Sequence, residues 1–160
     1  MTDERSAALA DEFAATNEAV IAFAQSCDAA QWATEVPGED WPVGVVVHHI
    51  AEGHGGVLGW LETMARGEPV TDSGGDIDQR NAAHAGRAGG FGVDETVALL
   101  RDNGARLEAA LRGLTGEELA RTAPFGPADG ATLPVEALAA VTSRHAREHL
   151  AHAQSALGVT

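Results

Sequence analysis

The chain has 160 residues, which is enough for one domain with its own hydrophobic core. Its net charge of −14, with arginine as its only basic residue besides histidine, argues against nucleic-acid binding, because contacts to phosphate supply most of that affinity. No apolar run approaches the ~18 residues of a membrane span, no cleavable signal follows Met1, and Cys27 has no partner for an internal disulfide. We therefore expect one cytoplasmic domain over residues 1–160, without nucleic-acid or membrane partners.

Two helices are predicted in the first half of the chain. Apolar residues recur at spacings of three and four from Leu9 to Cys27, which is one face of an amphipathic helix. A connection follows, with a turn signal at Pro37-Gly38. The second helix begins near Trp41-Pro42, because proline is favoured at a first helical position, and ends at Gly67.

Residues 67–92 form a long, glycine-rich connection, with a short helix predicted around 78–87. A connection of this length is unusual in a compact domain and is often functional. It also has a geometric use, since a helix of ~20 residues is about 30 Å long. A segment that joins two parallel neighbours must run back along that whole length.

Two further helices are predicted in the second half. The apolar spacing is regular from Val93 to Leu114, with Gly92 as the cap and Glu95 three residues later. The final helix, for which Thr132 is a candidate cap, runs to about Leu157. No convincing strand is predicted. Four helices with one long crossover describe an all-α four-helix bundle.

The final helix carries three histidines on one stripe. On a helical wheel, His145, His149 and His152 fall with Leu138 and Val141 within roughly 80°, which predicts that they face the core. A single histidine there is more often a satisfied core residue. Three are harder to satisfy, because each buried imidazole needs partners for two ring nitrogens, and a shared metal ion meets several of those needs. His145 and His149 also have the i, i+4 spacing that presents two ligands to one ion.

A third ligand should come from the second helix. On its wheel, His49 and His54 lie at the two edges of the apolar arc, whereas His48 and Glu52 point well away from it. The pattern alone leaves His49 and His54 as equal candidates, and His84 stands apart from both histidine groups. Three imidazoles from two helices suit Zn²⁺, Ni²⁺ or Fe²⁺, with open positions for water or substrate.

One competing motif is present in the final helix. Residues 145–149 read H-x-x-E-H, the inverted zinc-peptidase motif, in which Glu148 would be the general base. That class takes a third ligand, a glutamate, from well downstream, and no acidic residue follows His149. We therefore expect Glu148 to be either a surface carboxylate or a carboxylate that contacts a ligand without binding the ion.

The sequence resembles the DinB-like metalloenzymes and, within them, the N-terminal domain of mycothiol-dependent maleylpyruvate isomerases. The resemblance spans most of the chain and is carried by four segments, which are 41–50, 76–81, 114–119 and 145–150. It implies a bundle of up-down-down-up order with one divalent ion bound by His49, His145 and His149. It leaves His54 as the alternative ligand and His152 as a neighbouring donor or proton shuttle.

For characterised relatives, the resemblance also implies chemistry with low-molecular-weight thiols such as mycothiol or bacillithiol. A metal ion with an open position lowers the pKa of a bound thiol and holds it as a nucleophile for S-transfer or isomerisation. Two departures are that these isomerases carry a second domain and have a carboxylate where this chain has His145.

The leading hypothesis is therefore a metal-dependent thiol transferase or isomerase, or a hydrolase, that acts on a small molecule. Zinc is the expected ion, with nickel or iron as alternatives. One alternative is a non-catalytic metal- or ligand-binding bundle with a stress-related role; another is a structural bundle with core histidines. A homodimer is common among the relatives.

Overall fold

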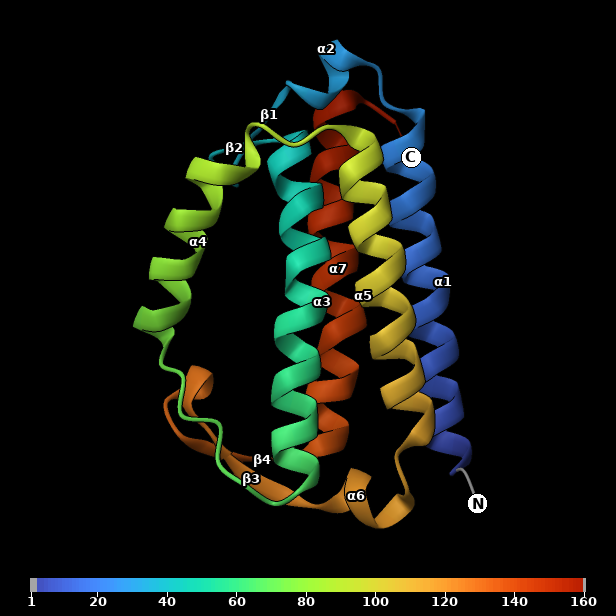
Figure 1. The fold of residues 1–160 in the computed structure, drawn as a ribbon, viewed down its shortest axis with the longest axis vertical. Helices are drawn as coiled ribbons and strands as arrows, with labels where there is room; N and C mark the ends of the chain where they lie inside the picture. The colour runs from blue at the N-terminus through green and yellow to red at the C-terminus, as the bar shows by residue number, and fades with distance from the viewer. Residues whose placement is uncertain (1–2, 160) are drawn as a thin grey trace.

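Four long helices lie side by side in the computed structural model, which describes residues 3–159 apart from the side chain of Ala88 (Figure 1). They are α1 (Glu4–Ser26), α3 (Val43–Ala65), α5 (Val93–Gly113) and α7 (Val135–Leu157). Helices α1 and α7 run in one direction, and α3 and α5 run in the other (Figure 1). Each of α1 and α3 packs against both α5 and α7. The predicted four-helix bundle of up-down-down-up order is confirmed.

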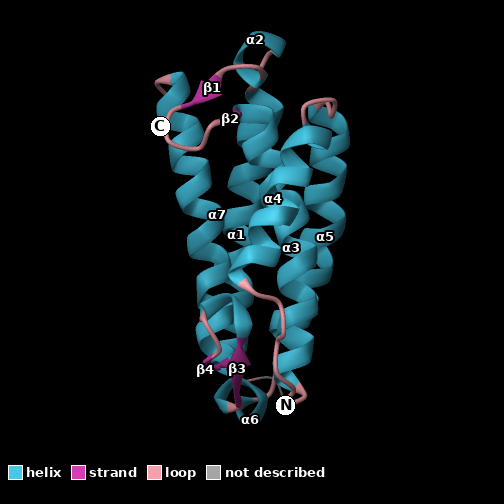
Figure 2. Cartoon of the chain, turned by 90° about the vertical axis from the view of Figure 1, so that its left-hand side faces the viewer, coloured by secondary structure: helices cyan, strands magenta, loops and turns pink. Residues whose placement is uncertain are grey.

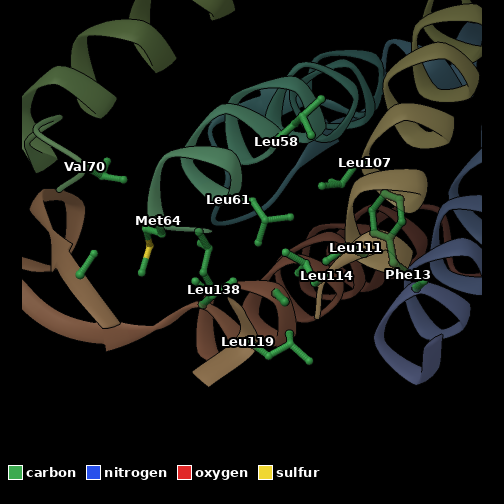
Figure 3. Close-up of a cluster of buried hydrophobic side chains, with 14 of the residues drawn as sticks. Phe13, Leu58, Leu61, Met64, Val70, Leu107, Leu111, Leu114, Leu119 and Leu138 are labelled. Atoms are coloured by element: carbon green, nitrogen blue, oxygen red, sulfur yellow. The ribbon is translucent and has the colours of Figure 1, made fainter. Parts of the chain in front are cut away.

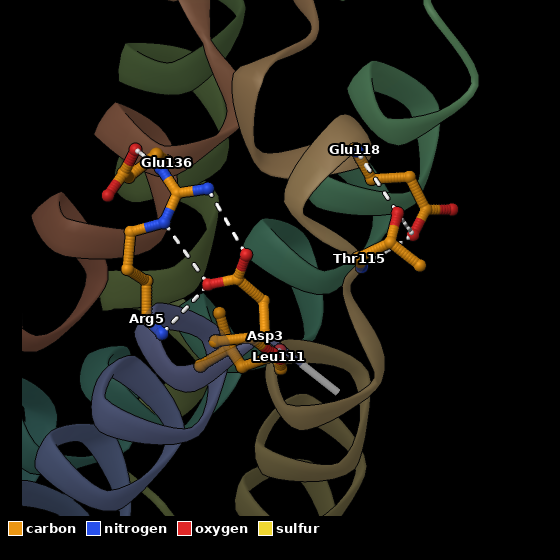
Figure 4. A network of polar contacts seen from close by, with 7 residues as sticks. Asp3, Arg5, Leu111, Thr115, Glu118 and Glu136 are labelled. Carbon is orange, nitrogen blue, oxygen red and sulfur yellow. Dashed lines mark hydrogen bonds and ion pairs between the residues drawn. The ribbon is translucent and has the colours of Figure 1, made fainter. Parts of the chain in front are cut away.

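The ends of these helices are fixed by side chains that satisfy free backbone groups. The Asp3 carboxylate accepts from the backbone N–H of Arg5 at 2.9 Å, and the Arg5 guanidinium reaches Glu136 at the start of α7 (Figure 4). Thr115 and Glu118 cap the short helix α6 (Gly116–Ala120) in the same manner, because each side chain accepts from the other's backbone N–H (Figure 4). These caps set where the chain turns at this end of the bundle.

The core consists of two apolar clusters stacked along the bundle. One surrounds Phe13, Leu61 and Leu107 (Figure 3), and the other surrounds Ile50 and Leu100. On α3 and α5, the turn between the clusters holds polar or small residues instead of large apolar ones. This division places a polar layer, which includes the buried His54, across the middle of the bundle.

The helix predicted within the crossover is longer than expected. Helix α4 (Gly74–Ala88) fills most of 67–92 and lies outside the bundle on the α3 side (Figures 1 and 2). It begins at Gly74 because Ser73 and Asp76 form a capping box. The Ser73 backbone N–H and hydroxyl donate to the Asp76 carboxylate at 2.7 and 2.8 Å, and the Asp76 backbone N–H donates to Ser73 Oγ. This capping box outweighs the cost of two glycines in the first turn.

The prediction that the chain lacks strands is wrong at two connections. Strands β1 (Glu35–Val36) and β2 (Trp41–Pro42) form one antiparallel pair, and β3 (Thr122–Phe125) and β4 (Ala131–Pro134) form another. Strands of two to four residues are too short for alternation to be recognised. Thr132 lies within β4, so the predicted cap is wrong as well, and α7 starts after Pro134. The remaining elements are α2 (Ala29–Trp32) and the 3₁₀ turn η1 (Gly126–Ala128).

None of the helices formed by residues 3–159 combines the length and the apolar character needed to cross a membrane.

Candidate metal centre

Three histidines from two helices converge near the end of the bundle where α3 begins. One ring nitrogen each from His49 on α3 and from His145 and His149 on α7 all lie within 4.8 Å of one another. The Nε2 atoms of His145 and His149 are 3.0 Å apart. The ring centroid of His49 lies 5.5 Å from the ring centroid of His145 and 5.1 Å from that of His149. Two nitrogen ligands of one tetrahedral zinc ion are about 3.3 Å apart. The donor set therefore fits a single ion.

The protonation state of these rings also suits metal binding, which requires a free nitrogen lone pair. Desolvation lowers the pKa of His49 to about 3, and the neighbouring rings of His149 and His145 add to this effect. The pKa of His145 is lowered by desolvation and by His149, although its ring remains open to solvent. Both rings are neutral at pH 7.

Glu39 completes the centre, and sequence analysis missed it. It lies in the turn between β1 and β2, and its carboxylate accepts from the Nδ1–H groups of His149 at 2.9 Å and His152 at 2.5 Å. Because Nδ1 of His149 carries the proton, the lone pair on Nε2 is directed at His145. A carboxylate that orients a histidine in this way is the usual support of a histidine ligand.

Glu39 is charged in this position. Its side chain is only 11% exposed, and this burial acts to raise its pKa. The hydrogen bond from His152 and the nearby His149 ring act in the opposite direction and prevail, so the net pKa lies below the ordinary value. The centre therefore combines three converging imidazoles with one carboxylate, which contacts His149 and His152 on the side away from the converging nitrogens.

The core-facing placement predicted for the α7 histidines is wrong for His145 and His152, whereas only 17% of the His149 side chain is exposed. The His152 side chain is 59% exposed and contacts Glu39, outside the group of converging nitrogens, and the His145 side of α7 is open. The buried face of α7 carries Val135, Leu138 and Leu150 together with five small residues, which are Ala139, Thr142, Ser143, Ala146 and Ala153. Small side chains let helices approach closely, but they contribute little to an apolar pattern, so the wheel selected a neighbouring stripe.

The alternative ligand, His54, lies elsewhere in the bundle. Its Nε2 is 3.0 Å from Oδ1 of Asn17 on α1, and the Asn17 amide nitrogen donates to the Leu100 carbonyl. This second bond fixes the orientation of the amide, so His54 Nε2–H donates to Asn17. His54 is buried in the polar layer between the two core clusters, and the structure does not bring it into the group formed with His145.

We expect His54 to make the protein sensitive to acid. Desolvation lowers its pKa to about 4, so between about pH 6.5 and pH 4 the unfolded chain binds a proton that the folded chain does not. Unfolding is therefore favoured as the pH falls. From pH 7 to pH 5, wild type should lose about 2 kcal/mol more unfolding free energy than His54→Gln, whose amide can still donate to Asn17. Urea unfolding of both metal-free proteins at pH 7, 6 and 5 measures this difference, and parallel profiles would contradict it.

A cavity of about 300 Å³ adjoins the converging histidines. His49 and His145 contribute to its wall, which is otherwise largely apolar and includes Trp60. Helix α4 closes another side with Asn81 and with Arg80, whose guanidinium pairs with Asp72 at 3.3 Å. A small organic molecule in this cavity would lie directly beside the imidazole nitrogens.

The structure gives no role in this centre to Glu148. Its side chain is 64% exposed and faces Arg144, one turn away on the outer surface of α7. The inverted zinc-peptidase motif therefore lacks its base at the converging histidines.

The fold is an up-down-down-up four-helix bundle, and two of its helices bring three histidines together. The chain therefore has the architecture of a helical protein with a candidate metal site. The chain belongs to the DinB superfamily, whose sequence profile matches residues 12–153. A comparison with curated protein sequences finds no significant match.

Solved structures share the fold at low sequence identity. YfiT from Bacillus subtilis, described as "a probable metal-dependent hydrolase with an unusual four-helix bundle topology", matches with a TM-score of 0.79 and 20% identity, over 100% of this chain and 91% of its own. A mycothiol-dependent maleylpyruvate isomerase matches with a TM-score of 0.71 and 18% identity, over 93% of this chain and 59% of its own. A mutant of such an isomerase gives a TM-score of 0.72 at 16% identity.

Proposed function

We propose that this protein is a divalent-metal-dependent enzyme in which His49, His145 and His149 hold one ion beside the cavity. The observation that carries the proposal is the convergence of three imidazole nitrogens within 4.8 Å, at the wall of a cavity of about 300 Å³. Three nitrogen ligands are typical of catalytic zinc sites, which keep a further position open for water or substrate. Zinc is the expected ion, and nickel and iron suit the same donors.

The residues of the chain have separate tasks in this centre. Glu39 holds the proton of His149 on Nδ1 and keeps its Nε2 available. The wall that includes Trp60 and Leu138 offers a substrate an apolar surface beside the ligands. A bound divalent ion would lower the pKa of a coordinated thiol or water and supply it as a nucleophile.

We further propose a low-molecular-weight thiol of the mycothiol or bacillithiol type as cosubstrate, for S-transfer or isomerisation. Support comes from the shared fold of the mycothiol-dependent maleylpyruvate isomerase and from the volume of the cavity, which can admit a small electrophile beside the ligands. His49 and His145 are the two proposed ligands that line the cavity, so an electrophile bound there would lie next to a thiol held by the ion.

Hydrolysis is the second candidate, and the similarity to YfiT over the whole chain favours it. The two reactions differ in whether a thiol or a water molecule occupies the open position of the ion. The apolar wall does not distinguish between them, because it suits either an electrophilic small molecule or the acyl part of an ester or amide.

Turnover by the zinc-loaded protein tests both candidates. Small electrophiles, esters and amides should be assayed with and without added mycothiol or bacillithiol. We expect turnover that requires the thiol, that is lost in His145→Ala, and that is retained in the surface variant Glu148→Gln. Turnover without any thiol would replace the transferase by the hydrolase, and metal binding without turnover on any substrate would indicate a non-catalytic bundle.

A further inference from the structure

Three side chains of types that can ligate a metal ion meet on the opposite side of α3 from the bundle core. His48 and Glu52 lie one turn apart on α3, and His84 reaches them from α4. One ligand atom from each lies within 4.8 Å of the others, and His48 Nδ1 is 2.9 Å from His84 Nε2. None of the three belongs to the centre formed by His49, His145 and His149. The sequence analysis did not connect His84 with His48 and Glu52, because nothing in the pattern showed that α4 covers this face of α3.

This cluster is enclosed by aromatic residues. His48 and His84 are 4% and 3% exposed. The His48 ring stacks on Phe91 with a centroid distance of 4.5 Å, and the His84 ring lies against Trp41 at 5.7 Å. His84 Nδ1 is buried without a hydrogen-bond partner in the described part of the chain. This atom is the other ring nitrogen from the Nε2 that faces His48, and a buried polar atom of this kind usually binds an ordered water.

Helix α4 has little apolar surface with which to bind the bundle. Surface helices ordinarily bury an apolar stripe, but among the described α4 side chains only His84 is fully buried, and the one large aliphatic residue, Ile77, is half-buried. The ion pair between Arg87 and Glu52, at 3.4 Å, is exposed and adds little. The contact between α4 and α3 therefore depends on a buried polar side chain, which is costly unless its nitrogens are engaged.

We propose that His48, Glu52 and His84 bind a second divalent ion of the zinc type and that this ion fastens α4 to α3. Two imidazoles and a carboxylate are a frequent zinc donor set. The nitrogen separation of 2.9 Å at this site is close to the 3.0 Å between His145 and His149. The proposal shares no ligand with the first centre and does not rest on its function.

The second ion would also shape the cavity. Glu52 and His84 line the same cavity as His49 and His145, from the side of α4. Release of the ion removes the link through His84, the one fully buried side chain among those described on α4, so α4 separates from α3 more readily and the cavity opens. Helix α4 would thus act as a lid over the cavity, and the second ion would hold this lid closed.

Metal stoichiometry tests the second site. After zinc loading and dialysis, elemental analysis should give two equivalents per chain for wild type, one for His84→Ala, one for His145→Ala, and less than about a tenth for the double variant. Glu52→Gln, which keeps the two histidines in place, should also bind one equivalent of zinc tightly. This variant tests the second site if His84→Ala fails to fold. Arg87→Gln is the matched control, since it removes the partner of Glu52 without removing a ligand, and should bind two. One equivalent in wild type, with no loss in His84→Ala or Glu52→Gln, would overturn the proposal.

Hydrogen exchange of α4 provides a readout that does not depend on activity. Zinc should slow the exchange of backbone amides within 74–88 by at least about tenfold in wild type and in His145→Ala, and should have no such effect in His84→Ala or Glu52→Gln. Equal protection of α4 in all four proteins would show that the ion does not fasten this helix. Because His145→Ala lacks the first centre, a failure of the proposed enzymatic function would leave this result unchanged.

Discussion

Replacement of His145 by alanine should weaken zinc binding at the centre formed with His49 and His149 by at least about 100-fold. Four-ligand zinc sites in zinc-finger peptides have binding free energies of ~10–16 kcal/mol, which corresponds to about 3 kcal/mol for each ligand. His145 is one of only three converging imidazoles, and its Nε2 is 3.0 Å from that of His149. Two ligands with open solvent on one side cannot retain the ion against water.

The measurement should isolate one site. We suggest competition with a chromophoric chelator in the His84→Ala background, where the proposed second ion is absent. His145 is exposed, so its loss should leave the metal-free melting temperature nearly unchanged, and weaker binding would not reflect unfolding. Glu148→Gln, on the outer face of the same helix, is the control and should bind as the parent does. An affinity unchanged in His145→Ala would exclude His145 from the ligands.

The long helices were predictable because their apolar residues are large and regularly spaced. The spacing along α5 from Val97 to Leu111 corresponds to residues that are buried, and the predicted face of α1 behaves in the same way. Helix α7 shows the limit of this signal. Five of the eight buried residues on this helix are alanine, serine or threonine, which pack closely but contribute little to an apolar arc. Periodicity therefore placed its histidines on the core side, although it placed His145 and His149 on one common face.

The choice between His49 and His54 could not be made from periodicity. Both flank the same apolar arc of α3, and what separates them lies on other helices. Asn17 of α1 engages His54, whereas His145 and His149 of α7 meet His49. The resemblance to a family favoured His49, and the geometry of the bundle supplies the physical reason.

The wheel also placed His48 and Glu52 well away from the apolar arc of α3, without indicating what covers them. They are covered by α4, a helix with one fully buried described side chain. The signal that favours α4 is its capping box at Ser73, since its apolar content is too low to predict docking. A helix of this composition that nevertheless packs on a buried histidine pair is the reason to look for an ion between them.

Glu39 lies 110 residues before His149, in a turn that sequence analysis treated as a simple connection. Its position depends on the hairpin between β1 and β2, where Gly38 and Asp40 adopt positive φ angles of 88° and 57°. Gly38 is suited to that conformation, and aspartate tolerates it better than most residues. The turn brings the carboxylate to the outer side of α7, where it meets the Nδ1 atoms of His149 and His152.

Replacement of Glu39 by glutamine should therefore lower zinc affinity at the centre by about 10–100-fold, the range found when a carboxylate behind a histidine ligand is removed. The amide oxygen can still accept one hydrogen bond, but it carries no charge and holds the proton on His149 Nδ1 less firmly. The same chelator competition in the His84→Ala background measures the loss.

His152→Ala is the matched variant, because it removes the other partner of Glu39 and leaves the bond to His149 intact. It should change the zinc affinity by less than about threefold, since His152 is 59% exposed and lies outside the converging nitrogens. If His152→Ala weakened binding as much as Glu39→Gln, the carboxylate would act through His152, and His152 would have to be placed among the groups that hold the ion. If neither variant changed the affinity, the orientation of His149 would be set by α7 alone, and the hairpin would serve only to close the end of the bundle.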